Sequence, residues 1–66
     1  MKINRIKEIL KQKGIIQTWL AEKMKKSYTT INEYARNVRQ PRVENLFEIA
    51  DILQVKVTDL LVNKKT

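Results

Sequence analysis

Cysteine and histidine are absent from this 66-residue sequence, and glycine and proline occur only once each. Disulfides therefore cannot form, and the common zinc sites lack their ligands, so we expect no metal and no cofactor. A domain of this size buries only about 60% of the surface that its unfolded chain exposes. Without covalent or metal supports, its stability must come from tight helix packing, from dimerisation or from both.

Long hydrophobic runs are also absent. The start Met1-Lys2-Ile3-Asn4-Arg5 is not followed by the apolar stretch of a signal peptide. No segment approaches the roughly 20 apolar residues that span a bilayer. We therefore predict a soluble, cytoplasmic protein with no membrane partner.

Acidic residues are scarce in the first two-thirds of the chain. Residues 1–42 contain 11 Lys/Arg and 3 Asp/Glu, whereas residues 43–63 contain one Lys and 4 Asp/Glu; the net charge is +7. This asymmetry favours a basic face that binds a polyanion and a separate, acidic face that has a different role. A surface charge that only keeps the protein in solution is the alternative interpretation.

The apolar spacing predicts an all-α chain. Helices are expected at 3–13, 17–24, 28–36, 43–53 and 58–62, packed as a compact five-helix bundle. Gly14 can end the first helix. Ser27 can cap the start of the third helix, and Asn37 can end that helix. We assign residues 1–63 to one domain and residues 64–66 to a short basic tail.

The segments 17–24 and 28–36, separated by a three-residue break, form a helix-turn-helix pattern. The outward positions of the second helix carry groups that read base edges. Asn can pair with adenine, Glu can accept from the cytosine amine, and the Thr methyl can meet that of thymine. The candidate base contacts are Tyr28, Thr29, Asn32 and Glu33.

Phosphate-seeking groups surround this helix. Gln17 starts a helix whose free amides favour an anion, and the loop before Pro41 is basic. The full set of candidate phosphate contacts is Gln17, Lys26, Ser27, Arg36, Arg39 and Arg42. The other lysines considered, Lys2, Lys7, Lys11 and Lys23, are interpreted mostly as solubilising surface.

From Ile3 to Leu61 the chain resembles the Cro/phage-repressor helix-turn-helix family, also called the XRE family. The resemblance rests on the motifs Lys13-Gly14, Gln17-x-x-Leu20-Ala21-x-x-Met24, Ser27-x-x-x-Ile31-x-x-Tyr34, Arg36-Asn37, Pro41, Leu46-x-x-Ile49-Ala50-x-x-Leu53-x-Val55 and Leu60-Leu61. It implies a lambda-repressor-like bundle that binds double-stranded DNA. We predict a small transcriptional regulator that acts by occupying its site, as a repressor does. The resemblance also implies that 28–36 is the recognition helix, with base contacts at the four positions named above and phosphate contacts at Gln17 and Arg39.

The sequence departs from the family pattern at several positions. Lys25 stands where the turn usually has Gly, and a left-handed Lys costs about 1–2 kcal/mol. Ile16, Arg42 and Lys56 replace the usual Ser or Thr caps, at about 1 kcal/mol each. An Arg–Glu pair common in the family is replaced by Leu10 and Ala35, which can make an apolar contact instead.

The C-terminal quarter has more apolar surface than a short helix can bury. Val57, Leu61 and Val62 are candidate dimer residues, and a two-fold homodimer would match a two-fold-symmetric operator.

Trp19 either packs on Lys23 or the 43–53 helix, or marks a partner surface. An antitoxin-type protein-interaction module that also binds its own operator is the alternative function, with a protein partner that the sequence does not identify. RNA binding would need aromatic side chains displayed for stacking on bases, and Tyr28 and Trp19 alone are candidates. No catalytic constellation supports an enzyme.

Overall fold

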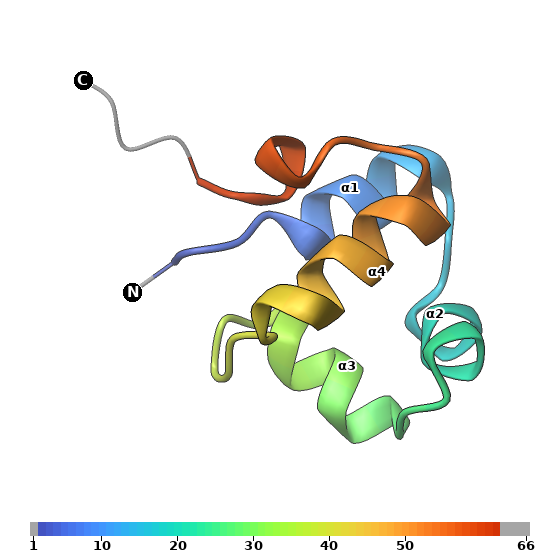
Figure 1. The fold of residues 1–66 in the computed structure, drawn as a ribbon. Coiled ribbons are helices and arrows are strands. Elements are labelled where there is room, and N and C mark those ends of the chain that lie inside the picture. The colour runs from blue at the N-terminus through green and yellow to red at the C-terminus, as the bar shows by residue number, and fades with distance from the viewer. Residues whose placement is uncertain (1, 63–66) are drawn as a thin grey trace.

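The computed structural model describes residues 2–62, which contain four α-helices and one 3-10 turn (Figure 1). The helices are α1 (Ile6–Lys13), α2 (Gln17–Met24), α3 (Tyr28–Ala35) and α4 (Val43–Leu53), and the 3-10 turn is η1 (Val57–Leu60). The predicted all-α class is therefore confirmed. The tail assigned to 64–66 lies outside the described residues. None of the helices between residues 2 and 62 is long and apolar enough to cross a membrane.

The two ends of the predicted helix pattern are wrong. The first helix begins at Ile6 instead of Ile3, because Asn4 pairs with Leu61 in an antiparallel bridge and holds the preceding chain extended. The fifth element is a single 3-10 turn instead of an α-helix over 58–62. Its backbone bonds join residues three apart, and Leu61 is already extended at φ −108°.

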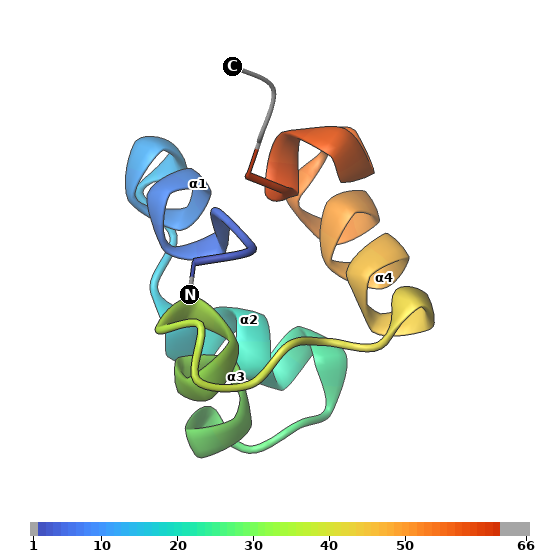
Figure 2. The same cartoon turned by 90° about the vertical axis from the view of Figure 1, so that its left-hand side faces the viewer.

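The core collects the apolar face of every element. Figure 2 shows α1 and α4 on opposite sides, with the α2–α3 pair beneath them and η1 at the upper end of α4. Leu20 and Ile31 are fully buried where the lower pair meets the rest. The buried cluster comprises Ile6, Ile9, Leu10, Leu20, Ala21, Met24, Ile31, Tyr34, Ile49, Ala50, Leu53 and Leu60. Ala35 is also buried, so both replacements for the family's Arg–Glu pair lie inside.

One polar side chain, Asn4, is buried in the described part of the chain, with 1% of its surface exposed. Its Nδ2 donates to the Tyr34 carbonyl at 2.9 Å and to Gln40 Oε1 at 2.8 Å. Its Oδ1 accepts from the Ile6 backbone N–H at 3.0 Å, which satisfies an orphan donor of α1. Asn4 therefore ties the start of α1 to the end of α3 and to the loop after it.

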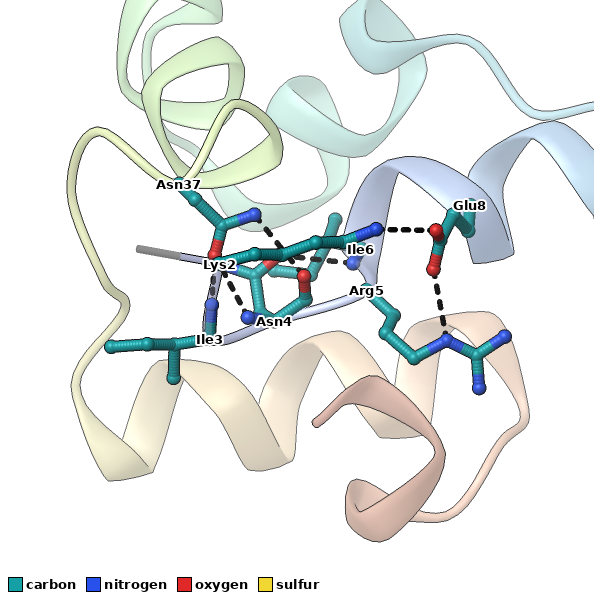
Figure 3. Close-up of polar contacts among 7 residues, drawn as sticks. All are labelled: Lys2, Ile3, Asn4, Arg5, Ile6, Glu8 and Asn37. Carbon is teal, nitrogen blue, oxygen red and sulfur yellow. Dashed lines mark hydrogen bonds and ion pairs between the residues drawn. The ribbon is translucent and has the colours of Figure 1, made fainter. Parts of the chain in front are cut away.

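Asn37 completes this connection from the other side (Figure 3). Its Oδ1 accepts from the backbone N–H groups of Ile3 and Asn4, both at 2.8 Å. Its Nδ2 donates to the Asn4 carbonyl at 3.1 Å. Asn37 is left-handed at φ 61°, as expected for the residue that ends the third helix. The segment before α1 is thus fixed against the α3–α4 loop, which carries Arg39.

The α2–α3 turn passes through Lys25 in the left-handed conformation, at φ 57° and ψ 42°. We expect Lys25→Gly to raise the free energy of unfolding by about 1 kcal/mol, because glycine adopts this conformation without steric cost. For a domain of this size, that gain corresponds to a rise in Tm of roughly 4–8 °C. Thermal unfolding followed by circular dichroism measures it.

Gly14→Ala is the matched control for this change. Gly14 has φ +68°, and a Cβ built there meets no heavy atom within 4 Å, so only backbone strain opposes the substitution. Gly14→Ala should therefore lower Tm while Lys25→Gly raises it. A Tm for Lys25→Gly at or below that of the wild type would contradict the strain account.

Candidate nucleic-acid interface

The α2–α3 unit is held rigid by its inner face and by a cap. Leu20, Ala21 and Met24 of α2 are buried, as are Ile31 and Tyr34 of α3. The Ser27 Oγ accepts from the Thr30 backbone N–H at 3.1 Å, which confirms the predicted cap of the third helix. No side chain caps α2 at Ile16 or α4 at Arg42, as their residue types predict.

The four candidate base-contact residues lie along the outer side of α3. Tyr28 and Thr29, at its N-terminus, are exposed, and Tyr28 leaves 53% of its surface accessible. Asn32 and Glu33, one turn later, are half-buried. A helix that presents its first turn and its polar side to solvent has the form required to enter a major groove.

Gln17 and Asn32 are joined across the two helices. The Asn32 Nδ2 donates to Gln17 Oε1 at 3.0 Å. This bond uses one of the two Asn32 amide protons and its direction leaves the Oδ1 as an acceptor. A donor and an acceptor on one amide are what a bidentate contact with adenine needs. Gln17 is therefore placed to hold the Asn32 amide in one orientation.

Glu33 and Arg39, predicted to contact a base and a phosphate, lie beside each other. The Arg39 Nη1 is 3.6 Å from Glu33 Oε1, and the Glu33 carbonyl accepts from the Val38 and Arg39 backbone N–H groups. The loop is thereby attached to the last turn of α3. A phosphate that binds Arg39 would compete with the Glu33 carboxylate for the guanidinium.

Three of the predicted phosphate contacts line one open hollow of about 490 Å³ between the α2–α3 turn, the loop and the start of α4. We call this the turn hollow, and its cations are Lys26, Arg39 and Arg42. Its other lining residues are Tyr34, Gln40, Glu44 and Asn45. Sequence reasoning missed Gln40 and Asn45, since their place beside the cations depends on how the loop folds back.

The remaining phosphate candidates are dispersed. Gln17, the first residue of α2, lines a second hollow with Tyr28. Ser27 is exposed, but its hydroxyl already accepts the Thr30 N–H. Arg36 is exposed at the C-cap of α3 and is not among the lining residues of either hollow. The structure therefore gathers Lys26, Arg39 and Arg42 and leaves Arg36 apart from them.

Carboxylates neutralise few of the basic groups. Within residues 2–62 the ion pairs are Lys2–Glu8, Arg5–Glu8 and Arg39–Glu33. Hydrogen bonds from Lys2 and Arg5 lower the pKa of the exposed Glu8 carboxyl (Figure 3). The surface around α2 and α3 consequently keeps most of its positive charge, as a polyanion partner requires.

The dimer candidates have unequal exposure. Val57 and Val62 are half-buried, and Val57 packs against the core, while Leu61 is 37% exposed. Sequence reasoning overlooked Val43 and Phe47 on α4, which are 65% and 59% exposed. Val43 and Phe47, four residues apart on α4, therefore form a second exposed apolar pair.

Trp19 lies on α2 with 38% of its surface exposed. The Lys23 Nζ is 5.3 Å from the centroid of its ring, within the range of a cation–π contact. Of the interpretations offered by the sequence, packing on Lys23 therefore matches this geometry.

A family model described as helix-turn-helix matches residues 6–60 of the chain. Among solved structures, the crystal structure of a proposed DNA-binding protein from Bacteroides fragilis superposes with a TM-score of 0.90 at 39% sequence identity. The alignment covers 94% of this chain and 100% of that one. A search of curated protein sequences found no match.

Proposed function

The chain belongs to the XRE-type helix-turn-helix family, and on this basis we propose that it is a sequence-specific DNA-binding repressor. The chain is a DNA-binding transcription regulator by family. We place α3 in the major groove of double-stranded DNA. The Bacteroides fragilis relative, itself proposed to bind DNA, supports this partner.

The observation that carries the proposal is the polar outer side of α3 between two hollows. Asn32, oriented by Gln17, is the group best prepared to read a base, and it accounts for discrimination of adenine. Tyr28 and Thr29 precede it on the exposed first turn, and Glu33 follows it. Contacts at these four positions would supply the sequence preference.

Affinity comes from the turn hollow. Lys26, Arg39 and Arg42 converge there beside the first turn of α4, and each phosphate that they neutralise releases counterions. These contacts carry no sequence information, but they fix the position of α3 along the groove. Arg39 exchanges Glu33 for phosphate when it binds.

Repression would follow from occupancy of the site by a homodimer. A two-fold dimer through Val57, Leu61 and Val62 would present two α3 helices to half-sites about 34–36 Å apart. The exposure of Leu61 supports this interface. No second domain is needed, since a protein that covers a promoter excludes other proteins from it.

Selection of preferred sequences from a random duplex pool, at two salt concentrations, tests the proposal. Enrichment of one motif that persists at moderate salt would support specific readout, and two-fold symmetry in that motif would support a dimer. Retention that disappears with salt and enriches no motif would reduce the protein to a basic domain without sequence specificity.

A further inference from the structure

Two lysines of α1 lie beside the residues already proposed to contact DNA. Lys7 and Lys11 are exposed and one turn apart, so they lie on the same side of the helix. They line an open hollow of about 510 Å³ together with Gln17 and Tyr28. We call this the α1–α2 hollow; its other lining residues are Leu10, Ile15, Ile16 and Thr18.

The α1–α2 hollow is basic, although Lys7 and Lys11 also line a neighbouring hollow that includes Glu8. None of the residues that line the α1–α2 hollow is acidic, whereas the turn hollow includes Glu44. The ion pairs between described residues involve neither lysine, because the neighbouring Glu8 binds Lys2 and Arg5. Two like charges at i and i+4 repel each other, so an anion between Lys7 and Lys11 would remove an unfavourable interaction.

The two hollows lie at opposite ends of α2. The α1–α2 hollow includes Gln17 and Thr18 at its first turn, and the turn hollow includes Lys26, just after its last residue. A helix in the major groove has one phosphate backbone on each side. If α3 lies in the groove, each hollow can therefore receive the backbone of a different strand.

We propose that Lys7 and Lys11 bind backbone phosphates of the operator on the strand opposite to the turn hollow. This inference rests on the proposed function and extends the DNA footprint from α2 and α3 to α1. Ile16, which is 68% exposed beside the lysines, offers apolar surface to the deoxyribose between two phosphates. The exposed Tyr28 ring lies at the boundary between this contact and the base-reading face.

The test is the salt dependence of binding to the enriched duplex by a Lys7→Ala/Lys11→Ala variant. The slope of log K against log salt is negative, and loss of two phosphate contacts should reduce its magnitude by about 1.8. A Lys13→Ala/Lys56→Ala variant is the control, since it removes the same charge from exposed lysines that line neither hollow. Arg39→Ala, in the turn hollow, should reduce the magnitude of this slope by about 0.9. Unchanged thermal unfolding verifies that each variant is folded.

The inference stands if the salt dependence of binding becomes weaker only in the Lys7→Ala/Lys11→Ala variant and in Arg39→Ala. The Lys7→Arg/Lys11→Arg variant should keep the salt dependence of the wild type. The inference is overturned if the α1 variant binds with the wild-type slope, while the wild type still selects a motif; the proposed function then survives alone. Equal losses in the α1 and control variants would also overturn it, because they would reflect net charge instead of contact. Failure of the wild type to select any duplex would overturn the proposed function and this inference together.

Discussion

Asn4→Ala should lower the free energy of unfolding by about 3 kcal/mol, because Asn4 is a buried polar side chain whose loss leaves hydrogen-bonding groups without partners. The side chain is buried and makes three hydrogen bonds, to Tyr34, Gln40 and Ile6. Alanine would leave the Ile6 N–H and the Gln40 Oε1 without these partners, and each unsatisfied buried group costs about 1–3 kcal/mol.

That loss is large for so small a domain. At about 0.05–0.15 kcal/mol per residue, the total stability of the chain is roughly 3–10 kcal/mol. Urea unfolding followed by circular dichroism measures the difference. Lys2→Ala, which removes one exposed ion pair with Glu8, serves as the neighbouring control and should change stability by less than about 1 kcal/mol.

Asn4→Asp tests the hydrogen bonds of Asn4 separately from its packing, because the two side chains are nearly the same size but Asp lacks the amide donor. The carboxylate retains an acceptor for the Ile6 N–H but presents oxygen to the Tyr34 carbonyl and to Gln40 Oε1, which both require a donor. We therefore expect Asn4→Asp to be at least as destabilising as Asn4→Ala. A stability near that of the wild type for either variant would contradict the role assigned to this side chain.

Asn32→Ala should weaken binding to the enriched duplex by about 1–3 kcal/mol, which is roughly 5- to 150-fold. The reason is loss of a bidentate contact at one base pair. Binding to random DNA depends on phosphates and should change little. Titration of the enriched duplex, of a variant changed at the contacted base pair and of random DNA measures all three affinities. Equal losses on all three would exclude Asn32 from base readout.

The Gln17–Asn32 hydrogen bond predicts that substitutions at these two residues have coupled effects on DNA binding. If Gln17 acts partly by orienting the Asn32 amide, Gln17→Ala should also relax the base preference at that position. The Gln17→Ala/Asn32→Ala variant should then lose less affinity than the two single losses combined. Gln12→Ala, an exposed amide on α1, should combine additively with Asn32→Ala. Additive losses for the Gln17 pair would remove its orienting role.

Local signals were sufficient to predict the middle of the fold. The bounds of α2 and α4 agree with the expected 17–24 and 43–53, because a strong break precedes each apolar stripe: Gly14 precedes α2 and Pro41 precedes α4. The Ser27 cap and the left-handed Lys25 also follow from residues within one turn of the break. Such features depend on neighbours in the sequence and on little else.

The ends of the chain could not be predicted in the same way. Ile3 and Ile6 have helical spacing, but Asn4 pairs with Leu61 in an antiparallel bridge, and the helix begins only at Ile6. Nothing near Asn4 in the sequence indicates that distant partner. The left-handed Gln54, at φ 59°, likewise lacks the Gly or Asn that would have predicted it.

The candidate site shows the same division. Residue types on α3 were enough to select Asn32 and Glu33, but their contacts with Gln17 and Arg39 depend on how α2 and the loop lie against α3. The α1–α2 hollow was overlooked for this reason. Lys7 and Lys11 are ordinary exposed lysines until the start of α2 is placed beside them.

The pairing of the chain ends gives the protein a distant reporter of DNA binding. Arg5 N–H donates to the Leu60 carbonyl at 2.7 Å and Val62 N–H to that of Ile3 at 2.8 Å, contacts that close a loop of more than fifty residues. Such end contacts open through local fluctuations before the core does. Asn37 joins these end contacts to the loop that bears Arg39. A duplex that immobilises this loop should therefore also favour the state in which the two chain ends are paired, because the coupling between the two sites is reciprocal. Operator binding should therefore slow hydrogen exchange at the Arg5 amide, which lies outside both the proposed DNA contacts and the proposed dimer interface.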